Sequence, residues 1–266
     1  MRKAWTQLAV AIWCLLPITA ATPALAQGLQ ADQVVEQARK AYYSLEDAGM
    51  KGFRCDVSVD WGGLVAAQIP EENARASTLA LLRGGQFELA VGPTGVTEIS
   101  RHFDRAVPND PAAGAFRQVV DGAEQTLVSA FQQLTAFLFG PPLPPEGMRY
   151  KVEWQGTAYR ITSGVEPTVV VETLKQDLSL QEIIVATQDS TVTIHPLLKR
   201  GEKGYIPLEI EGKVEAAHAD PIALRVVVDY QNVQGLELPQ TITAQIQQAG
   251  ANRQARFTLG NCQIAN

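Results

Sequence analysis

Histidine and acidic residues in the 266-residue chain are the first candidates for chemistry. His102 and Asp104 are two residues apart, as are His218 and Asp220, a spacing that puts both side chains on one face of a strand. His195 stands alone at a predicted strand end. Zinc sites usually require three or four ligands at short, regular spacing, and none of these positions provides that. We therefore expect solvated surface pairs and no metal site.

Nucleophilic residues give no stronger signal. Ser163 and Ser190 lie beside no recognisable base, and Glu71 and Glu72 have the look of a solvated turn. The chain lacks the G-x-S-x-G, H-E-x-x-H and P-loop patterns that mark hydrolases, zinc proteases and nucleotide-binding proteins. The expectation is a protein that is not an enzyme and needs no cofactor.

The first 26 residues have the pattern of a cleaved bacterial Sec-type signal peptide. Arg2 and Lys3 form a basic start, residues 8–16 an apolar segment, and residues 24–26 an A-x-A cleavage site. Removing residues 1–26 leaves 240 residues and takes the net charge from −6 to −8, because Arg2 and Lys3 are lost. The predicted location is periplasmic or secreted.

The acidic balance of the mature chain bounds its partners. It argues against nucleic acid and against docking on anionic membranes. No later apolar run approaches the 18 residues or more that a membrane-spanning helix requires, so no transmembrane segment is expected in the mature protein.

Two cysteines, Cys55 and Cys262, remain after the signal. In an oxidising compartment an even pair is usually bonded, so we predict a disulfide between them. The alternative is a pair of buried free thiols.

A long helix is predicted over residues 110–140. Asp110 followed by Pro111 is a helix start, and Gly140 followed by prolines is a helix stop. Gly114 and Gly122 are positions where this helix could bend. Its apolar residues recur at steps of three and four and so form one stripe: Phe116, Val119, Val120, Ala123, Leu127, Ala130, Phe131, Leu134, Phe137 and Leu138.

The rest of the chain is mostly strand. Asp32 caps a predicted helix over residues 33–45, residues 51–61 alternate as a strand, and residues 64–82 fit either helix or strand. After the long helix, short strands follow one another to residue 264 without βαβ alternation. This pattern predicts an α+β fold with a curved antiparallel sheet, in a single domain over residues 27–266.

A curved sheet with one helix against it tends to leave a concavity, which is a common kind of apolar ligand site. The stripe of the long helix and the first strand supply the candidate residues of a hydrophobic cavity, although the same face could simply be core. The candidates are Phe53, Val57, Phe116, Val119, Val120, Leu127, Phe131, Leu134, Phe137 and Leu138.

Residues 230–239 (YQNVQGLELP) follow a Y-x-x-V-x-G-x-x-x-P pattern that resembles a segment of the outer-membrane lipoprotein-sorting carriers, the LolA/LolB-like fold. The order of predicted elements is similar too. The resemblance implies an unclosed β-barrel covered by an N-terminal helix and a long central helix, with a cavity for acyl chains. The chain departs from that family in lacking a Lys/Arg-Pro segment after the early strands, so it looks like a divergent member.

The resulting hypothesis is a binding or carrier protein that holds a lipid acyl chain or another hydrophobic ligand, in lipoprotein or lipid trafficking. Its partners would include envelope lipoproteins or membrane-bound proteins. The alternative is an envelope interaction module of the same fold, with a filled core and no ligand. A hydrolase with an unrecognised site is a third class.

Overall fold

The computed structural model describes residues 30–103 and 111–265, so the predicted signal over residues 1–26, together with Asp104 and Asp110, lies outside the described residues. The strands are β1 (Gly52–Val59), β2 (Gly85–Gly92), β3 (Gly95–Phe103), β4 (Tyr150–Trp154), β5 (Ala158–Val165), β6 (Thr168–Lys175), β7 (Leu180–Ala186), β8 (Ser190–Gly201), β9 (Gly204–Ala216), β10 (Ala219–Val233), β11 (Leu236–Gln248) and β12 (Ala251–Ala265). The helices are α1 (Ala31–Ala41), α2 (Trp61–Gln68), α3 (Glu72–Leu82) and α4 (Pro111–Leu138).

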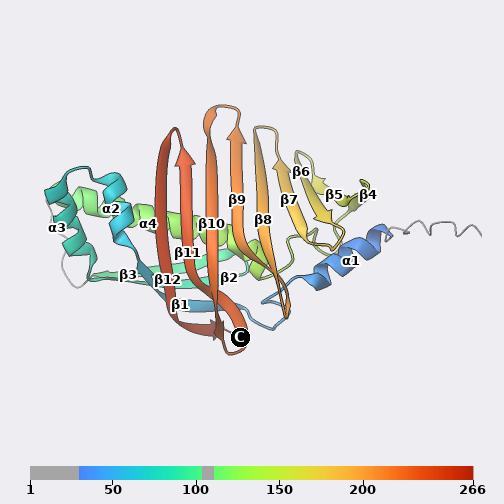
Figure 1. Ribbon diagram of the computed structural model, residues 1–266, viewed down its shortest axis with the longest axis horizontal. Helices are drawn as coiled ribbons and strands as arrows, with labels where there is room; N and C mark the ends of the chain where they lie inside the picture. The colour runs from blue at the N-terminus through green and yellow to red at the C-terminus, as the bar shows by residue number, and fades with distance from the viewer. Residues whose placement is uncertain (1–29, 104–110, 266) are drawn as a thin grey trace, which may run out of the picture.

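All twelve described strands belong to one antiparallel sheet, in the order β3-β2-β1-β12-β11-β10-β9-β8-β7-β6-β5-β4 (Figure 1). Strands β3 and β4 form its two edges, so the sheet is unclosed. The predicted α+β class and the large antiparallel sheet are therefore confirmed. Among the described helices, none is both long enough and apolar enough to span a bilayer.

Alternating side chains give the sheet one apolar face and one charged face. On β10, Val226 and Val228 are buried, whereas Arg225, which precedes Val226, is exposed. Arg225 donates hydrogen bonds to Glu209 of the neighbouring strand, with Nε 2.6 Å from Oε1. This alternation is expected for an antiparallel sheet that packs on one face and meets water on the other.

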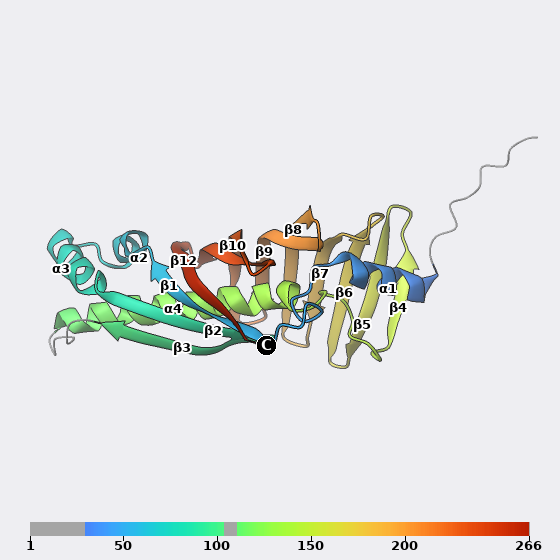
Figure 2. The same ribbon diagram turned by 90° about the horizontal axis from the view of Figure 1, so that it is seen from below.

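Helix α4 lies along the apolar face of the sheet. Figure 1 shows α4 crossing strands β8–β11, and Figure 2 shows β2 and β3 running alongside it. The helix contacts β9, β11 and β12 as well as the edge strand β3, whose Arg101 pairs with Asp121 of α4 at 2.7 Å. A register shift between Arg54 and Asp56 of β1, of the kind that bends a strand, stands where the sheet changes direction.

The first predicted helix is wrong at both ends. It begins at Ala31, where Gln30 and Gln33 form a reciprocal capping box, so the predicted cap Asp32 lies inside the helix. It ends at Ala41 because Tyr42 is extended and tied to other elements. The Tyr42 hydroxyl accepts a hydrogen bond from the Leu180 amide at 2.6 Å, a tertiary contact that the local pattern cannot reveal.

The strand predicted over residues 51–61 is also longer than the observed strand. Strand β1 ends at Val59, and Trp61 begins α2 because the Asp60 side chain caps that helix by accepting a hydrogen bond from the Gly62 amide at 3.1 Å. The buried Trp61 happens to continue the alternation of the strand, which explains the error. The ambiguous residues 64–82 fall in α2 and α3, apart from the three-residue link 69–71 between these helices.

The long central helix is confirmed, and it is continuous. It runs for 28 residues, about 42 Å at 1.5 Å per residue, and neither Gly114 nor Gly122 interrupts it. The hairpin over residues 230–239 also forms, with a register shift at Tyr230, which lies opposite Pro239. The helix therefore offers one uninterrupted surface to the sheet.

Candidate functional site

The apolar stripe of α4 is buried in the core. Phe131 and Leu134 are 0% exposed, and all ten side chains predicted to line a cavity are at most 3% exposed. Phe53 of β1 packs on the stripe, with its ring centroid 6.1 Å from that of Phe131 and 6.3 Å from that of Phe139. The structure thus brings the predicted residues together but leaves them almost no accessible surface. Their role as ligand contacts stays a prediction, because a ligand would reach them only if α4 moved.

A cleft of about 500 Å³ lies along a different side of α4, between this helix, α2 and the ends of strands β9–β12. Its volume falls in the range of small-molecule sites. The helix contributes a wall of small or uncharged polar residues that recur at steps of one to four: Gly122, Gln125, Thr126, Ser129 and Gln133.

Opposite the helix, the cleft is lined by apolar side chains of the sheet, which we call the apolar floor. Val214, Ile222, Leu224 and Ile246 line the cleft, and each is half-buried. Because directly opposed residues share a face, these side chains belong to two rows across the strands. In register order the rows are Val192–Val214–Ile222 and Ile194–Gly212–Leu224–Ile246.

The apolar floor continues past the cleft. Val185 of β7 is opposite Val192, and Val170 of β6 is opposite Val185. Both valines are half-buried, as are Val192 and Val214. A partly exposed apolar surface therefore extends from β6 to β10 on the same face as the core.

Two glutamine amides at the cleft have unsatisfied oxygens. The Oε1 atoms of Gln68 and Gln133 are shielded from solvent and have no hydrogen-bond partner. Both residues line the cleft, one from α2 and one from α4. A buried carbonyl without a donor carries a desolvation cost of about 1–3 kcal/mol, which a donor that reached either oxygen would recover.

Charge is nearly absent from the cleft. Among the described residues that line it, Arg253 alone carries a charge, and its side chain is exposed. The ion pairs of these strands, such as Lys213 with Glu215 at 2.6 Å, involve exposed side chains instead. The cleft therefore suits a largely apolar ligand with uncharged polar groups better than a strongly ionic one.

Glu172 of β6 is a buried carboxyl near the same surface. It continues the second row, because it is opposite Ile183, which in turn is opposite Ile194. Its side chain is 4% exposed, and its Oε2 has no hydrogen-bond partner. Burial raises the pKa of Glu172 to about 7, since no nearby cation compensates for the lost water.

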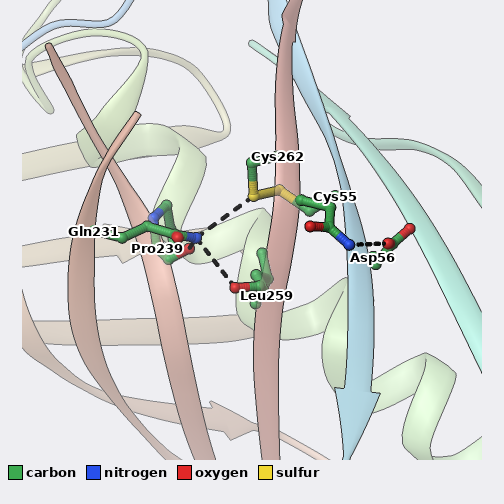
Figure 3. Close-up of a disulfide and its surroundings, with 7 residues drawn as sticks. Cys55, Asp56, Gln231, Pro239, Leu259 and Cys262 are labelled. Atoms are coloured by element: carbon green, nitrogen blue, oxygen red, sulfur yellow. Dashed lines mark hydrogen bonds between the residues drawn. A yellow bond between two sulfur atoms is a disulfide. The ribbon is translucent and has the colours of Figure 1, made fainter. Parts of the chain in front are cut away.

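The predicted disulfide between Cys55 and Cys262 is present and closes a sequence separation of 207 residues. It joins β1 to β12, the two strands where the sheet changes direction (Figure 3). Gln231 of β10 supports it, because its Nε2 donates a hydrogen bond to the Leu259 carbonyl at 3.1 Å and lies 3.5 Å from the Cys262 Sγ. The disulfide thus links β1 covalently to β12.

His102, His195 and His218 lie on separate elements and do not form a site together. His102 lies on β3, His195 on β8, and His218 in the turn before β10. His195 lies 3.7 Å from Glu182. In the described part of the chain, no group of three or more His, Cys, Asp or Glu side chains is placed to hold a metal ion.

Sequence reasoning missed the cleft residues, although a signal existed. Between Gly122 and Gln133 the side of α4 that lines the cleft carries Gln125, Thr126 and Ser129. A helix surface that simply meets water usually carries charged residues. The second signal, Glu172 within the apolar strand Val-Val-Val-Glu-Thr-Leu, marks a carboxyl at a position that the alternation places inward.

In comparisons with known proteins, no family model, no curated protein and no solved structure matches this chain, so its function is inferred from the geometry of the cleft.

Proposed function

We propose that the protein binds a single acyl chain, or a similarly elongated hydrophobic ligand, non-covalently in the cleft between α4 and the sheet. One observation carries the proposal: half-buried Val214, Ile222, Leu224 and Ile246 face an uncharged helix wall across an accessible space. Contiguous exposed apolar surface is unusual on soluble proteins and commonly marks a binding groove. Binding, rather than catalysis, is the activity we propose.

The dimensions of the floor favour an elongated ligand. From Val170 on β6 to Ile222 on β10, the first row crosses four strand spacings, or about 19 Å. Burying an apolar chain along such a row gains about 0.8 kcal/mol for each methylene removed from water. A chain of ten or more methylenes would therefore bind usefully even after the entropic cost of association.

The fuller form of the proposal assigns the protein to the bacterial envelope as a carrier. Its basis is the predicted signal over residues 1–26, the pattern of residues 230–239, and the expected cover of an unclosed barrel by an N-terminal and a central helix. These features resemble the lipoprotein-sorting carriers, and a carrier needs a site from which a chain can leave. The partners in this proposal are envelope lipoproteins or membrane-bound proteins that donate and accept the chain.

A second candidate function is a protein-interaction module with a filled core. The complete burial of Phe131, Leu134 and the rest of the stripe favours it, because these side chains leave no space beneath α4. In that case the cleft would hold no lipid.

Probe binding separates the two candidates. Delipidated wild-type protein should bind a fluorescent fatty-acid analogue saturably, at one site per chain. Ser129→Trp should abolish binding, because Ser129 lines the cleft and the indole would fill it. Ala136→Trp is the matched control, since Ala136 is an exposed residue of α4 outside the cleft. Absence of saturable binding by the wild type would favour the filled module.

A further inference from the structure

The side chain of Gln133 occupies a gap in the apolar floor. Gly212 is the only glycine in the row Ile194–Gly212–Leu224–Ile246, and its missing side chain leaves room above β9. A Cβ atom added to Gly212 would lie 3.5 Å from Oε1 and 3.7 Å from Nε2 of Gln133. The amide of α4 therefore reaches across the cleft to the floor.

In this position the side-chain carbonyl of Gln133 accepts no hydrogen bond. Its Oε1 is shielded from solvent and has no partner. An unpaired buried acceptor is costly, and it recovers that cost when a donor reaches it. A ligand donor that reached this oxygen would therefore gain a hydrogen bond at one point of an otherwise apolar floor.

Gln68 repeats the arrangement toward the other end of the cleft. It lies beside Gly122, where an added Cβ would be 3.4 Å from its Nε2, and its Oε1 is also unpaired. Gly122 and Gln133 are eleven residues apart on α4, so the two amides are separated by about 16 Å along the helix. The two acceptors can therefore be tested one at a time.

The two unpaired oxygens constrain the head group of a ligand. An unpaired carbonyl oxygen attracts O–H and N–H groups and repels the oxygens of a carboxylate or phosphate, although the NH2 group of the same amide can donate to such oxygens. Arg253, the one charged residue of the lining, is exposed on β12, three strands away from Gly212 on β9. An anionic head at Gln133 would have no cation beside it.

We propose, resting on the acyl-chain function above, that the ligand is an acyl compound with an uncharged hydrogen-bond donor, a hydroxyl or an amide N–H, which the carbonyl of Gln133 accepts at the gap left by Gly212. The chain lies along the apolar floor, and Gln133 selects the head group. Free fatty acids and phosphate-headed lipids are the compounds that this site disfavours.

The test compares three probes with the same twelve-carbon chain. Monododecanoylglycerol offers hydroxyl donors, methyl dodecanoate offers none, and dodecanoic acid at pH 8 is a carboxylate. Each competes with a fluorescent fatty-acid analogue on delipidated protein. The wild type should bind the glycerol ester about tenfold more tightly than the methyl ester, the effect of one buried hydrogen bond, and more tightly than the acid.

Gln133→Leu should remove that preference, so that the glycerol and methyl esters bind equally. Gln132→Leu is the matched control, because it is the same substitution at an exposed neighbouring residue outside the cleft. This variant should keep the wild-type preference. Gln133→Met gives a second, unbranched variant in case the first unfolds. Gln68→Leu should leave the preference unchanged.

The outcomes separate this inference from the proposed function. If every protein binds the three probes equally, or if the preference survives Gln133→Leu, acyl binding stands and the role of Gln133 is wrong. Tightest binding of dodecanoic acid would also overturn the inference and point to Arg253. If the wild type binds neither the fluorescent analogue nor any of the three probes, the proposed function itself fails.

Discussion

The two sides of helix α4 face the same sheet, yet one is closed and the other is open. On the closed side Phe131 and Leu134 fill the space to the sheet and are 0% exposed. On the open side Gly122 and Ser129 are small, and a cleft of about 500 Å³ remains. Side-chain size, rather than the course of the backbone, decides which side can hold a ligand.

The difference also shows what an apolar stripe indicates. The most apolar face of α4 is the most completely buried and leaves no space for a ligand. The accessible apolar surface belongs to strand residues such as Val214 and Ile222, which face a polar helix wall. A binding groove is therefore expected where an apolar surface meets an incomplete partner, and not where two apolar surfaces meet.

The largest expected effect comes from a charge placed on each side. Phe131→Glu would bury an unpaired carboxylate in the core and should prevent folding. Ser129→Glu, at a half-buried position in the cleft, should fold and cost about 1 kcal/mol or less. Circular dichroism and urea melts distinguish these results. A folded Phe131→Glu protein would mean that water reaches the closed side.

Removal of the disulfide should have the next largest effect, and only on stability. Replacing Cys55 and Cys262 with Ala should lower the free energy of unfolding by up to about 5 kcal/mol, the chain-entropy value for a loop of this length. Probe affinity should not change, because neither cysteine lines the cleft. Urea melts with and without reductant provide the measurement, and equal melts would contradict the prediction.

Glu172 should make stability depend on pH. Its pKa is raised from 4.5 to about 7 in the folded state, so the folded protein binds more protons than the unfolded chain between these values. The free energy of unfolding should therefore fall as the pH rises from about 4.5 to 7, by about 3 kcal/mol, and then level off.

Glu172→Gln should remove this dependence, because the amide does not titrate. The variant should be more stable than the wild type at pH 8 and similar to it at pH 4. Urea melts at several pH values test this. Parallel stability profiles for the two proteins would show that Glu172 is not the group responsible.

The smallest effects on stability are expected at the floor. Leu224→Ala removes a half-buried side chain and should cost about 1 kcal/mol, whereas Leu134→Ala in the core should cost about 2–5 kcal/mol. Affinity for an acyl probe should show the reverse order, with the larger loss at Leu224. Equal probe affinities in the two variants would contradict the prediction that the ligand contacts the floor and not the core.

Local pattern predicted much of this fold. The helix predicted over residues 110–140 is present as Pro111–Leu138. Its stripe, which we predicted to line a ligand cavity, is buried, so contact with a ligand there stays a prediction. Errors arose where tertiary contacts override local signals, as at Tyr42, or where a capped helix follows a strand in phase, as at Asp60 and Trp61.

The cleft could not be predicted in the same way. Its floor depends on the register between strands, which places Gly212 between Ile194 and Leu224. Its polar wall depends on which side of α4 faces the sheet. Neither fact is written in the spacing of residues within one element, although the uncharged stripe from Gly122 to Gln133 was a usable signal.

Photo-crosslinking with a diazirine-bearing fatty-acid analogue, followed by mapping of the labelled peptides, tests most directly that ligands bind on the open side of α4. The account predicts saturable labels on the α4 segment with Gln125, Ser129 and Gln133 and on the facing parts of β10 and β11, all displaced by excess unlabelled acyl compound. Labels confined to the outward face of the sheet, or labelling that competitor does not displace, would contradict it.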